Sequence, residues 1–109
     1  MDVVIFRFDV IWVNLDPSVS HEIQKTRPCV VISPDEMNHS RFGMIIVAPL
    51  TSTLRRFPTR VLVKCEGKEG EVALDQMRSI DRVRVINKMT HLDSKSAQRV
   101  LAILQEMFA

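Results

Sequence analysis

The chain has 109 residues, enough for one domain with a real core and too few for a second, so we expect a single domain over residues 1–109. Its 46% hydrophobic and 26% charged residues are typical of a folded soluble protein, and a net charge of +2 does not by itself indicate a polyanionic partner. No apolar run approaches the ~18 residues of a membrane helix, and the first residues lack a basic signal-peptide region, so we expect a cytoplasmic protein with no membrane association.

Five segments carry the β-branched or alternating pattern of strands. They are residues 9–15, 29–33, 44–50, 59–65 and 71–80. After Asp81 the pattern becomes helical, and Asp93 can cap a C-terminal helix. The apolar face of this helix consists of Ala97, Val100, Leu101, Leu104 and Phe108. Short antiparallel strands followed by a terminal helix predict a mainly β fold, a small and partly open barrel.

The two cysteines, Cys29 and Cys65, both lie in apolar strand segments. Buried thiols are more often packing residues than a disulfide or a metal pair. The sequence has no Cys-x-x-Cys or His-x-x-x-His spacing, so we expect no metal and no cofactor.

Arg27 stands before Pro28 at the start of an apolar strand segment. Proline has no N–H and disfavours helix at the residue before it, so Arg27 is expected to be extended, anchored behind and exposed ahead. The alternative is an ordinary solvated charge at a strand end.

Other polar residues fall at strand ends. Thr51 and Ser52 follow the third strand, where they could be turn residues that satisfy their own backbone. Asp75 and Gln76 interrupt the fifth apolar run, where a buried carboxylate needs a partner or a function, unless a β-bulge leaves it solvated.

Two loop segments add further candidates. His21 lies in the first long polar segment, where a surface histidine is the default and a general base the less common case. Arg55 and Arg56 precede Phe57 in a short basic and aromatic run, which could also be a solvated face. Residues 16–26 and 52–58 contain few apolar anchors, so we expect them to be mobile in the free protein.

Five stretches together resemble the MazF/PemK/Kid toxins of bacterial toxin–antitoxin modules. They are WVNLDP (12–17), HEIQKTRPCVVISP (21–34), VAPLTS (47–52), ALDQMRSID (73–81) and THLD (90–93). The likeness spans nearly the whole chain, in the right order and spacing. It implies an SH3-like, CcdB-like β-barrel, a homodimer, and a ribosome-independent endoribonuclease that cuts single-stranded RNA at short sequences. A cognate, MazE-like antitoxin with an acidic disordered tail would neutralise it.

Carried over by motif, the family's essential arginine falls on Arg27 and its essential threonine on Thr51. His21 matches the histidine of the Kid branch, and Asp75 with Gln76 matches the family's Asp-Gln pair, whose aspartate is the base in that branch. The wider set of RNA-binding candidates is Glu22, Gln24, Lys25, Thr26, Ser52, Arg55, Arg56, Gln76 and Arg78.

Two positions depart from the family. The Kid branch places its proposed acid, an arginine, two residues before the aspartate, and this chain has Ala73 there. The Kid-type acid and base assignment therefore cannot be transferred whole. Phe8 stands where the family usually carries glycine before Asp9, which puts the entry to the first strand in doubt.

Metal-free RNA cleavage uses the substrate's own 2′-hydroxyl as nucleophile, so a protein must stabilise the phosphorane charge and move two protons. Arg27 suits the first task because a guanidinium is always charged and binds phosphate oxygens in a fork. Thr51 could donate to a phosphate oxygen, and either Asp75 or His21 could accept the proton. The products would be a 2′,3′-cyclic phosphate and a 5′-hydroxyl.

Two other functions remain open on the sequence. CcdB toxins share the barrel, carry no catalytic site and poison DNA gyrase by binding, and small SH3-like barrels also serve as passive interaction modules. Neither function needs Arg-Pro, Pro-x-Thr and Asp-Gln together, so the residues favour the ribonuclease.

Overall fold

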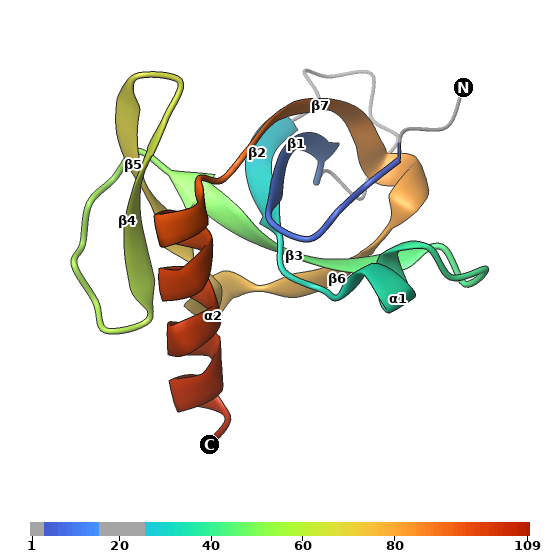
Figure 1. Ribbon diagram of the computed structural model, residues 1–109. Helices are drawn as coiled ribbons and strands as arrows, with labels where there is room; N and C mark the ends of the chain where they lie inside the picture. The colour runs from blue at the N-terminus through green and yellow to red at the C-terminus, as the bar shows by residue number, and fades with distance from the viewer. Residues whose placement is uncertain (1–3, 16–25) are drawn as a thin grey trace.

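The computed structural model describes residues 4–15 and 26–109, which form a curled antiparallel sheet and a C-terminal helix (Figure 1). The strands are β1 (Asp9–Asn14), β2 (Thr26–Val31), β3 (Met44–Thr51), β4 (Arg60–Cys65), β5 (Lys68–Ala73), β6 (Arg78–Asp81) and β7 (Val85–His91). The helices are α1 (Asp35–Asn38) and α2 (Ser94–Met107), with 3₁₀ turns η1 (Leu74–Gln76) and η2 (Arg82–Arg84). Strand order is β4-β5-β3-β2-β1-β7, with β6 also pairing with β3. The mainly β fold predicted from the sequence is confirmed.

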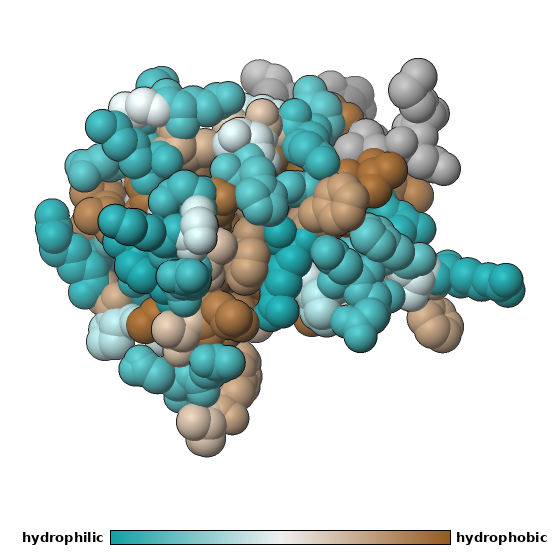
Figure 2. All heavy atoms as spheres, in the orientation of Figure 1, coloured by the Kyte–Doolittle hydropathy of each residue, from teal (hydrophilic) through white to brown (hydrophobic). Residues whose placement is uncertain are grey.

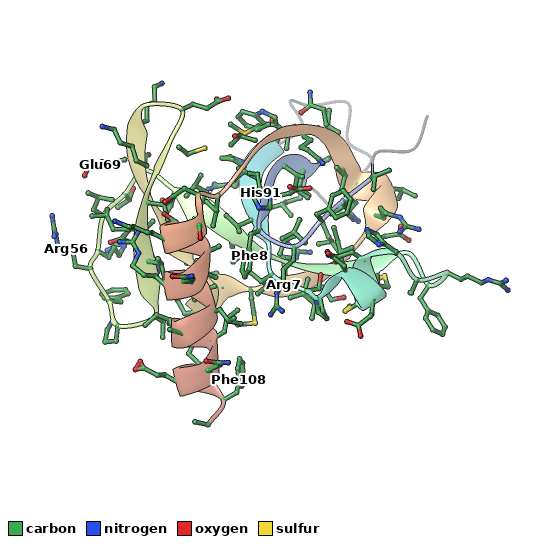
Figure 3. All side chains as sticks on the ribbon, viewed as in Figure 1. Arg7, Phe8, Arg56, Glu69, His91 and Phe108 are labelled. Carbon is green, nitrogen blue, oxygen red and sulfur yellow. The ribbon has the colours of Figure 1, made fainter. Side chains whose placement is uncertain are left out.

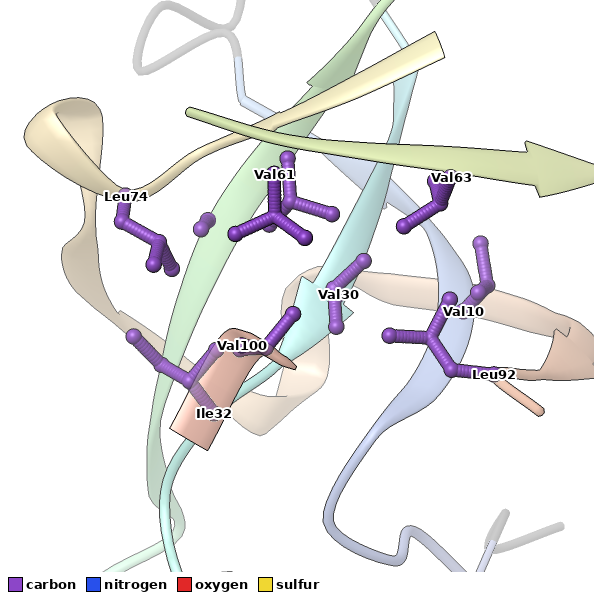
Figure 4. Close-up of a cluster of buried hydrophobic side chains, with 10 residues drawn as sticks. Val10, Val30, Ile32, Val61, Val63, Leu74, Leu92 and Val100 are labelled. Carbon is purple, nitrogen blue, oxygen red and sulfur yellow. The ribbon is translucent and has the colours of Figure 1, made fainter. Parts of the chain in front are cut away.

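Side chains alternate along each strand, so the sheet buries apolar residues on both faces. Val30 belongs to one core and its neighbour Val31 to the other. The first core, between the sheet and α2, contains Val10, Val30, Ile32, Ala48, Val61, Val63, Val72, Leu74, Leu92 and Val100 (Figure 4). The second core contains Ile5, Ile11, Val13, Cys29, Val31, Ile45, Val47 and Ile80. No helix within the described ranges has both the length and the apolar character required to cross a bilayer.

The C-terminal helix begins as predicted, with Asp93 at its N-cap. Val100 is buried in the first core, and Ala97 and Leu104 pack against it. The predicted apolar face is wrong at its end: α2 stops at Met107, and Phe108 beyond it is 72% exposed (Figure 3). Ile103 and Met107 also belong to the packed face. They provide the packing at the end of the helix that the sequence pattern assigns to Phe108.

The predicted strands at 9–15, 29–33, 44–50 and 59–65 are confirmed within a few residues. A single strand over 71–80 is wrong, because β5 ends at Ala73 and β6 begins only after η1. A helical pattern directly after Asp81 is also wrong, since β7 follows η2 and pairs with β1. β7 lies at a sheet edge with mostly exposed or half-exposed residues, which removes the alternation that marks a half-buried strand.

Phe8 adopts φ of +71°, in the left-handed region that glycine occupies at no steric cost. The entry to β1 therefore has a backbone that suits glycine, although the residue is phenylalanine. The ring packs against the first core, and the Arg7 guanidinium lies 5.3 Å from its centroid (Figure 3). The next residue, Asp9, is buried: its side chain accepts the Phe6 N–H at 2.8 Å and lies 2.7 Å from His91 Nδ1.

Candidate functional site

Arg27 and Thr51 lie at the same end of two neighbouring strands. β2 and β3 pair antiparallel through Val31↔Val47 and Cys29↔Pro49. Continued by two residues, this register places Arg27 opposite Thr51 on one face of the sheet. Arg27 is exposed, while its backbone pairs with Val13 of β1. The guanidinium is thus carried by paired strand backbone, as the Arg-Pro step predicts.

Arg78 adds a second cation on this face. β6 pairs with the other edge of β3 through Val47↔Arg78, and Arg78 lies two residues from the buried Ile80. Burial raises the pKa of the Cys29 thiol to about 12, and the positive charges of Arg27 and Arg78 act in the opposite direction. Both guanidiniums therefore contribute positive potential around the same buried atom. The thiols of Cys29 and Cys65 are free, and only Cys29 is fully buried.

Thr51 is half-buried where β3 ends. Its Oγ1 accepts the Thr53 N–H at 3.1 Å, which matches the turn role that the sequence left open. A hydroxyl that accepts one bond still carries a proton to donate, so this contact leaves Thr51 able to bind a phosphate oxygen. A groove of about 280 Å³ adjoins Thr51, and Trp12, Pro28 and Leu50 line its apolar side.

Asp75 lies in η1, and its partner is Arg60. Arg60 Nε donates to Asp75 Oδ1 at 2.7 Å and Arg60 Nη2 donates to Oδ2 at 3.3 Å, while Thr59 Oγ1 donates to Oδ1 at 3.0 Å. The Arg60 hydrogen bond is the main cause that holds the pKa of Asp75 below its usual range. The carboxylate expected to need a partner or a function thus has a partner. Asp75 is exposed, so the expectation of a buried carboxylate is wrong, and it lies in a 3₁₀ turn rather than in a β-bulge.

The sequence missed Glu71, a buried carboxylate in β5 that is 2% exposed. Its Oε1 accepts the Arg55 N–H at 2.9 Å and its Oε2 accepts the Arg56 N–H at 2.8 Å. A carboxylate inside the apolar run EVAL was a usable signal, because the reasoning applied to Asp75 applies equally to Glu71. Glu71 thus binds the backbone of the segment 52–58, which the sequence predicts to be mobile for lack of apolar anchors. The mobility of 52–58 stays a prediction, and nearly all of the other segment predicted to be mobile, 16–26, lies outside the described residues.

The other predicted residues are spread around these strand ends. Thr26 opens β2, Ser52 follows β3 and Gln76 closes η1, and all three are exposed. Arg55 and Arg56 have exposed side chains, and Figure 3 shows Arg56 pointing away from the sheet. Figure 2 shows mainly hydrophilic residues over the side of the molecule that holds β4 and β5. The predicted residues His21, Glu22, Gln24 and Lys25 lie outside the described residues.

The described part of the chain offers no obvious metal site. Within residues 4–15 and 26–109, no three His, Cys, Asp or Glu side chains are grouped so that they could hold an ion. Arg27, Arg78 and Thr51 instead provide two cations and a hydroxyl, which suit an anionic ligand.

Comparison with known proteins gives concordant results. A family model described as the PemK-like, MazF-like toxin of type II toxin–antitoxin systems matches residues 6–108. The chain is 33% identical to "Endoribonuclease EndoA" of Bacillus subtilis over 109 residues, covering 94% of this chain and 92% of that protein. It is 35% identical to "Endoribonuclease toxin MazF" of Escherichia coli K12 over 72 residues, covering 66% of this chain and 64% of that protein.

Solved structures show the same fold. The MazF crystal structure from Deinococcus radiodurans superposes with a TM-score of 0.79 at 28% identity, covering 98% of each chain. A chain of a MazE–MazF complex from the same organism superposes with a TM-score of 0.81 at 27% identity, covering 98% of this chain and 97% of that one.

Proposed function

The chain belongs to the PemK-like, MazF-like toxins of type II toxin–antitoxin systems, and from this membership we propose that it is an endoribonuclease toxin that cuts single-stranded RNA at short sequences. The observation that supports the proposal is the register of β2 and β3, in which Cys29 pairs with Pro49 and which, continued by two residues, would bring the exposed Arg27 opposite Thr51. Arg78 adds positive charge on the same face. A gyrase poison of the CcdB type is not favoured, because the relatives named above are endoribonucleases.

In the proposed reaction the RNA's 2′-hydroxyl loses its proton and attacks the adjacent phosphorus, the bond from phosphorus to the 5′-oxygen breaks, and the 5′-oxygen leaves with a proton taken from solvent water. The two products are a 2′,3′-cyclic phosphate and a 5′-hydroxyl. Arg27 binds the equatorial phosphate oxygens as charge accumulates on them, and Thr51 donates a hydrogen bond to one of these oxygens. Stabilisation of this kind by a fixed donor typically contributes about 10²–10³ to the rate.

The reaction also needs a proton acceptor for the 2′-hydroxyl. Asp75 is unsuited to this task because both of its oxygens are engaged by Arg60 and its pKa is lowered. We therefore assign proton acceptance to His21, whose ordinary pKa lies close to neutrality. Asp75 then serves to hold Arg60 and Thr59.

We propose that a MazE-like antitoxin with an acidic, hydrophobic tail neutralises the protein by covering the Arg27 and Arg78 face. The complex of MazE and MazF from Deinococcus radiodurans supports a MazE-like partner. A segment that mimics RNA's negative charge would compete directly for the same cations.

The decisive experiment incubates purified protein with one long RNA in excess EDTA and maps the new ends. We expect discrete cuts with cyclic phosphate and 5′-hydroxyl ends, and no cleavage where the sugar at the cut site is 2′-deoxy. Arg27→Ala should slow cleavage at least ~10²-fold, and Arg27→Lys should recover little because it restores charge without the planar fork.

Arg41→Ala is the matched control, since Arg41 is an exposed arginine in the turn before β3 and should leave the rate unchanged. The proposal fails if folded Arg27→Ala cleaves at the wild-type rate, or if 2′-deoxy substrate is cut as readily as RNA.

A further inference from the structure

We propose that Glu71 is a positioning residue for RNA binding: its buried carboxylate fixes the backbone of the β3–β4 loop (residues 52–59) so that the side chains of Arg55 and Arg56 are held ready for RNA phosphates. The inference rests on the proposed ribonuclease function. The contact that Arg55 and Arg56 make with RNA would be electrostatic and independent of base identity.

The contact between Glu71 and the loop has two points. The two carboxylate oxygens accept N–H groups from consecutive residues, Arg55 at 2.9 Å and Arg56 at 2.8 Å. Two bonds to neighbouring peptides fix the orientation of that stretch of backbone, since rotation of either peptide breaks one of them. Because the bonds use backbone N–H groups, the guanidiniums of both arginines stay in solvent, where they are exposed.

Arg60 balances the buried negative charge of Glu71. Its side chain is 5% exposed, and Nη1 lies 3.5 Å from Glu71 Oε1 while Nε lies 2.7 Å from Asp75 Oδ1. The hydrogen bond from the Arg55 N–H is the main cause that lowers the pKa of Glu71, and Arg60 acts in the same direction. Burying a carboxylate without such partners would be costly. These partners therefore favour the charged form of Glu71 in the folded protein.

The same arginine also secures the far end of the loop. The Arg60 guanidinium lies 5.2 Å from the centre of the Phe57 ring, and the Arg60 N–H donates to the Phe57 carbonyl at 3.0 Å. Glu71 holds the middle of the loop and Arg60 its exit. The exposed guanidiniums of Arg55 and Arg56 are therefore carried by a loop whose backbone is hydrogen-bonded in its middle and at its end.

The strand that carries Glu71 also holds Thr51 in place. Glu71 is the register partner of Thr51 in the β3–β5 ladder. At Gly70 the strands are so close that an added Cβ would lie 3.0 Å from the Thr51 carbonyl oxygen. β5 thus positions both the proposed catalytic threonine, Thr51, and the β3–β4 loop that follows it. Pre-ordering of this kind reduces the entropy cost of binding RNA.

The test measures binding of an uncleavable RNA, with 2′-deoxy sugar at the cut site, by Glu71→Gln over a range of salt. Glutamine keeps the size of the side chain but offers one acceptor oxygen and no charge. We expect Kd to rise ~5–10-fold and the slope of log Kd against log salt to fall by ~0.7 for each phosphate that the loop arginines no longer neutralise. On cleavable RNA, KM should rise while kcat changes less than ~3-fold.

Glu106→Gln is the matched control, because Glu106 is an exposed glutamate on α2, whereas Glu69 on the same strand as Glu71 lines the groove beside Thr51. Glu106→Gln should leave Kd and the salt slope unchanged. In a background of Arg55→Ala with Arg56→Ala, Glu71→Gln should weaken RNA binding no further, since its effect passes through those arginines. A general structural defect would weaken binding in that background as well.

Glu71→Asp provides a second variant that keeps the charge and shortens the reach by one methylene. Amide exchange at Arg55 and Arg56 should accelerate in both variants while β1 and β2 stay protected. Unchanged Kd and salt slope in folded Glu71→Gln or Glu71→Asp would overturn the inference and leave wild-type cleavage standing. Wild-type protein that neither binds nor cuts RNA would instead remove the proposed function, whatever the amides show.

Discussion

At the scale of single residues, the role of a carboxylate depends on its partners. Asp75 and Glu71 both interrupt apolar sequence, and both contact Arg60. The sequence shows that such carboxylates need compensation, but the compensating group is fifteen residues away along the chain for Asp75. The extended backbone of Arg27 could be predicted because the geometry imposed by proline is local. The need of Glu71 for compensation was visible in the run EVAL, but its partners were not, because they are backbone groups in another loop.

The positive φ of Phe8 predicts that glycine is more stabilising than alanine at this position, the reverse of the usual order. Alanine usually stabilises a chain relative to glycine by about 0.5–1 kcal/mol, but at φ of +71° a Cβ is strained. Phe8→Gly should therefore have an unfolding free energy about 1 kcal/mol higher than that of Phe8→Ala. Its urea unfolding midpoint should be correspondingly higher. The control is Ala102→Gly on the exposed side of α2, which should destabilise by about 1 kcal/mol. Equal stability of the two Phe8 variants would contradict this account.

At the scale of elements, local pattern predicted the strands that alternate and the helix that is amphipathic. It failed for β7, which is a strand because it pairs with β1 from Val85 to His91. Local pattern also failed to predict that the segment 71–80 forms two strands. β5 and β6 are separate because they pair with opposite ends of β3. Both errors have one cause: the pairing partners lie far away in sequence, and tertiary pairing overrides local preference.

The stability that Glu71 contributes by binding the β3–β4 loop should decrease as the pH falls. The pKa of Glu71 is lowered in the folded protein from 4.5, so its contribution to stability is present above that value and disappears as pH falls through the folded pKa. The difference in unfolding free energy between wild type and Glu71→Gln should be constant from pH 7 to about 5 and shrink below about 4. Urea unfolding of both proteins across this range measures it. A difference that grows towards acid would show the opposite sign.

At the scale of the whole molecule, exposed apolar groups gather beside an open groove. A groove of about 640 Å³ is lined in part by Val4, Val83 and Ile86, which are 58%, 84% and 50% exposed. The sheet also has edge strands, β4 and β7, at the ends of its main order. We therefore expect a symmetric dimer, which would cover such a surface.

Light scattering should report twice the chain mass at micromolar concentration. Val83→Asp should shift the protein towards monomer if its surface is the interface, because a buried unpaired charge is costly. Phe108→Ser, at the exposed end of α2, should leave the mass unchanged. A wild-type protein that scatters as a monomer would contradict the expectation.

The pairing of β1 with β7 also has a consequence for synthesis. On a ribosome β1 emerges with β2 close behind, but Val85 follows Asn14 by about 70 residues, or several seconds at usual elongation rates. During that interval one edge of β1 has no partner, and the buried Asp9 lacks its contacts with His91 and Lys88 of β7. The sheet that presents Arg27 is complete only after β7 has been translated and has paired with β1. A nascent chain would therefore lack the finished strand framework of the proposed site until β7 has emerged from the ribosome.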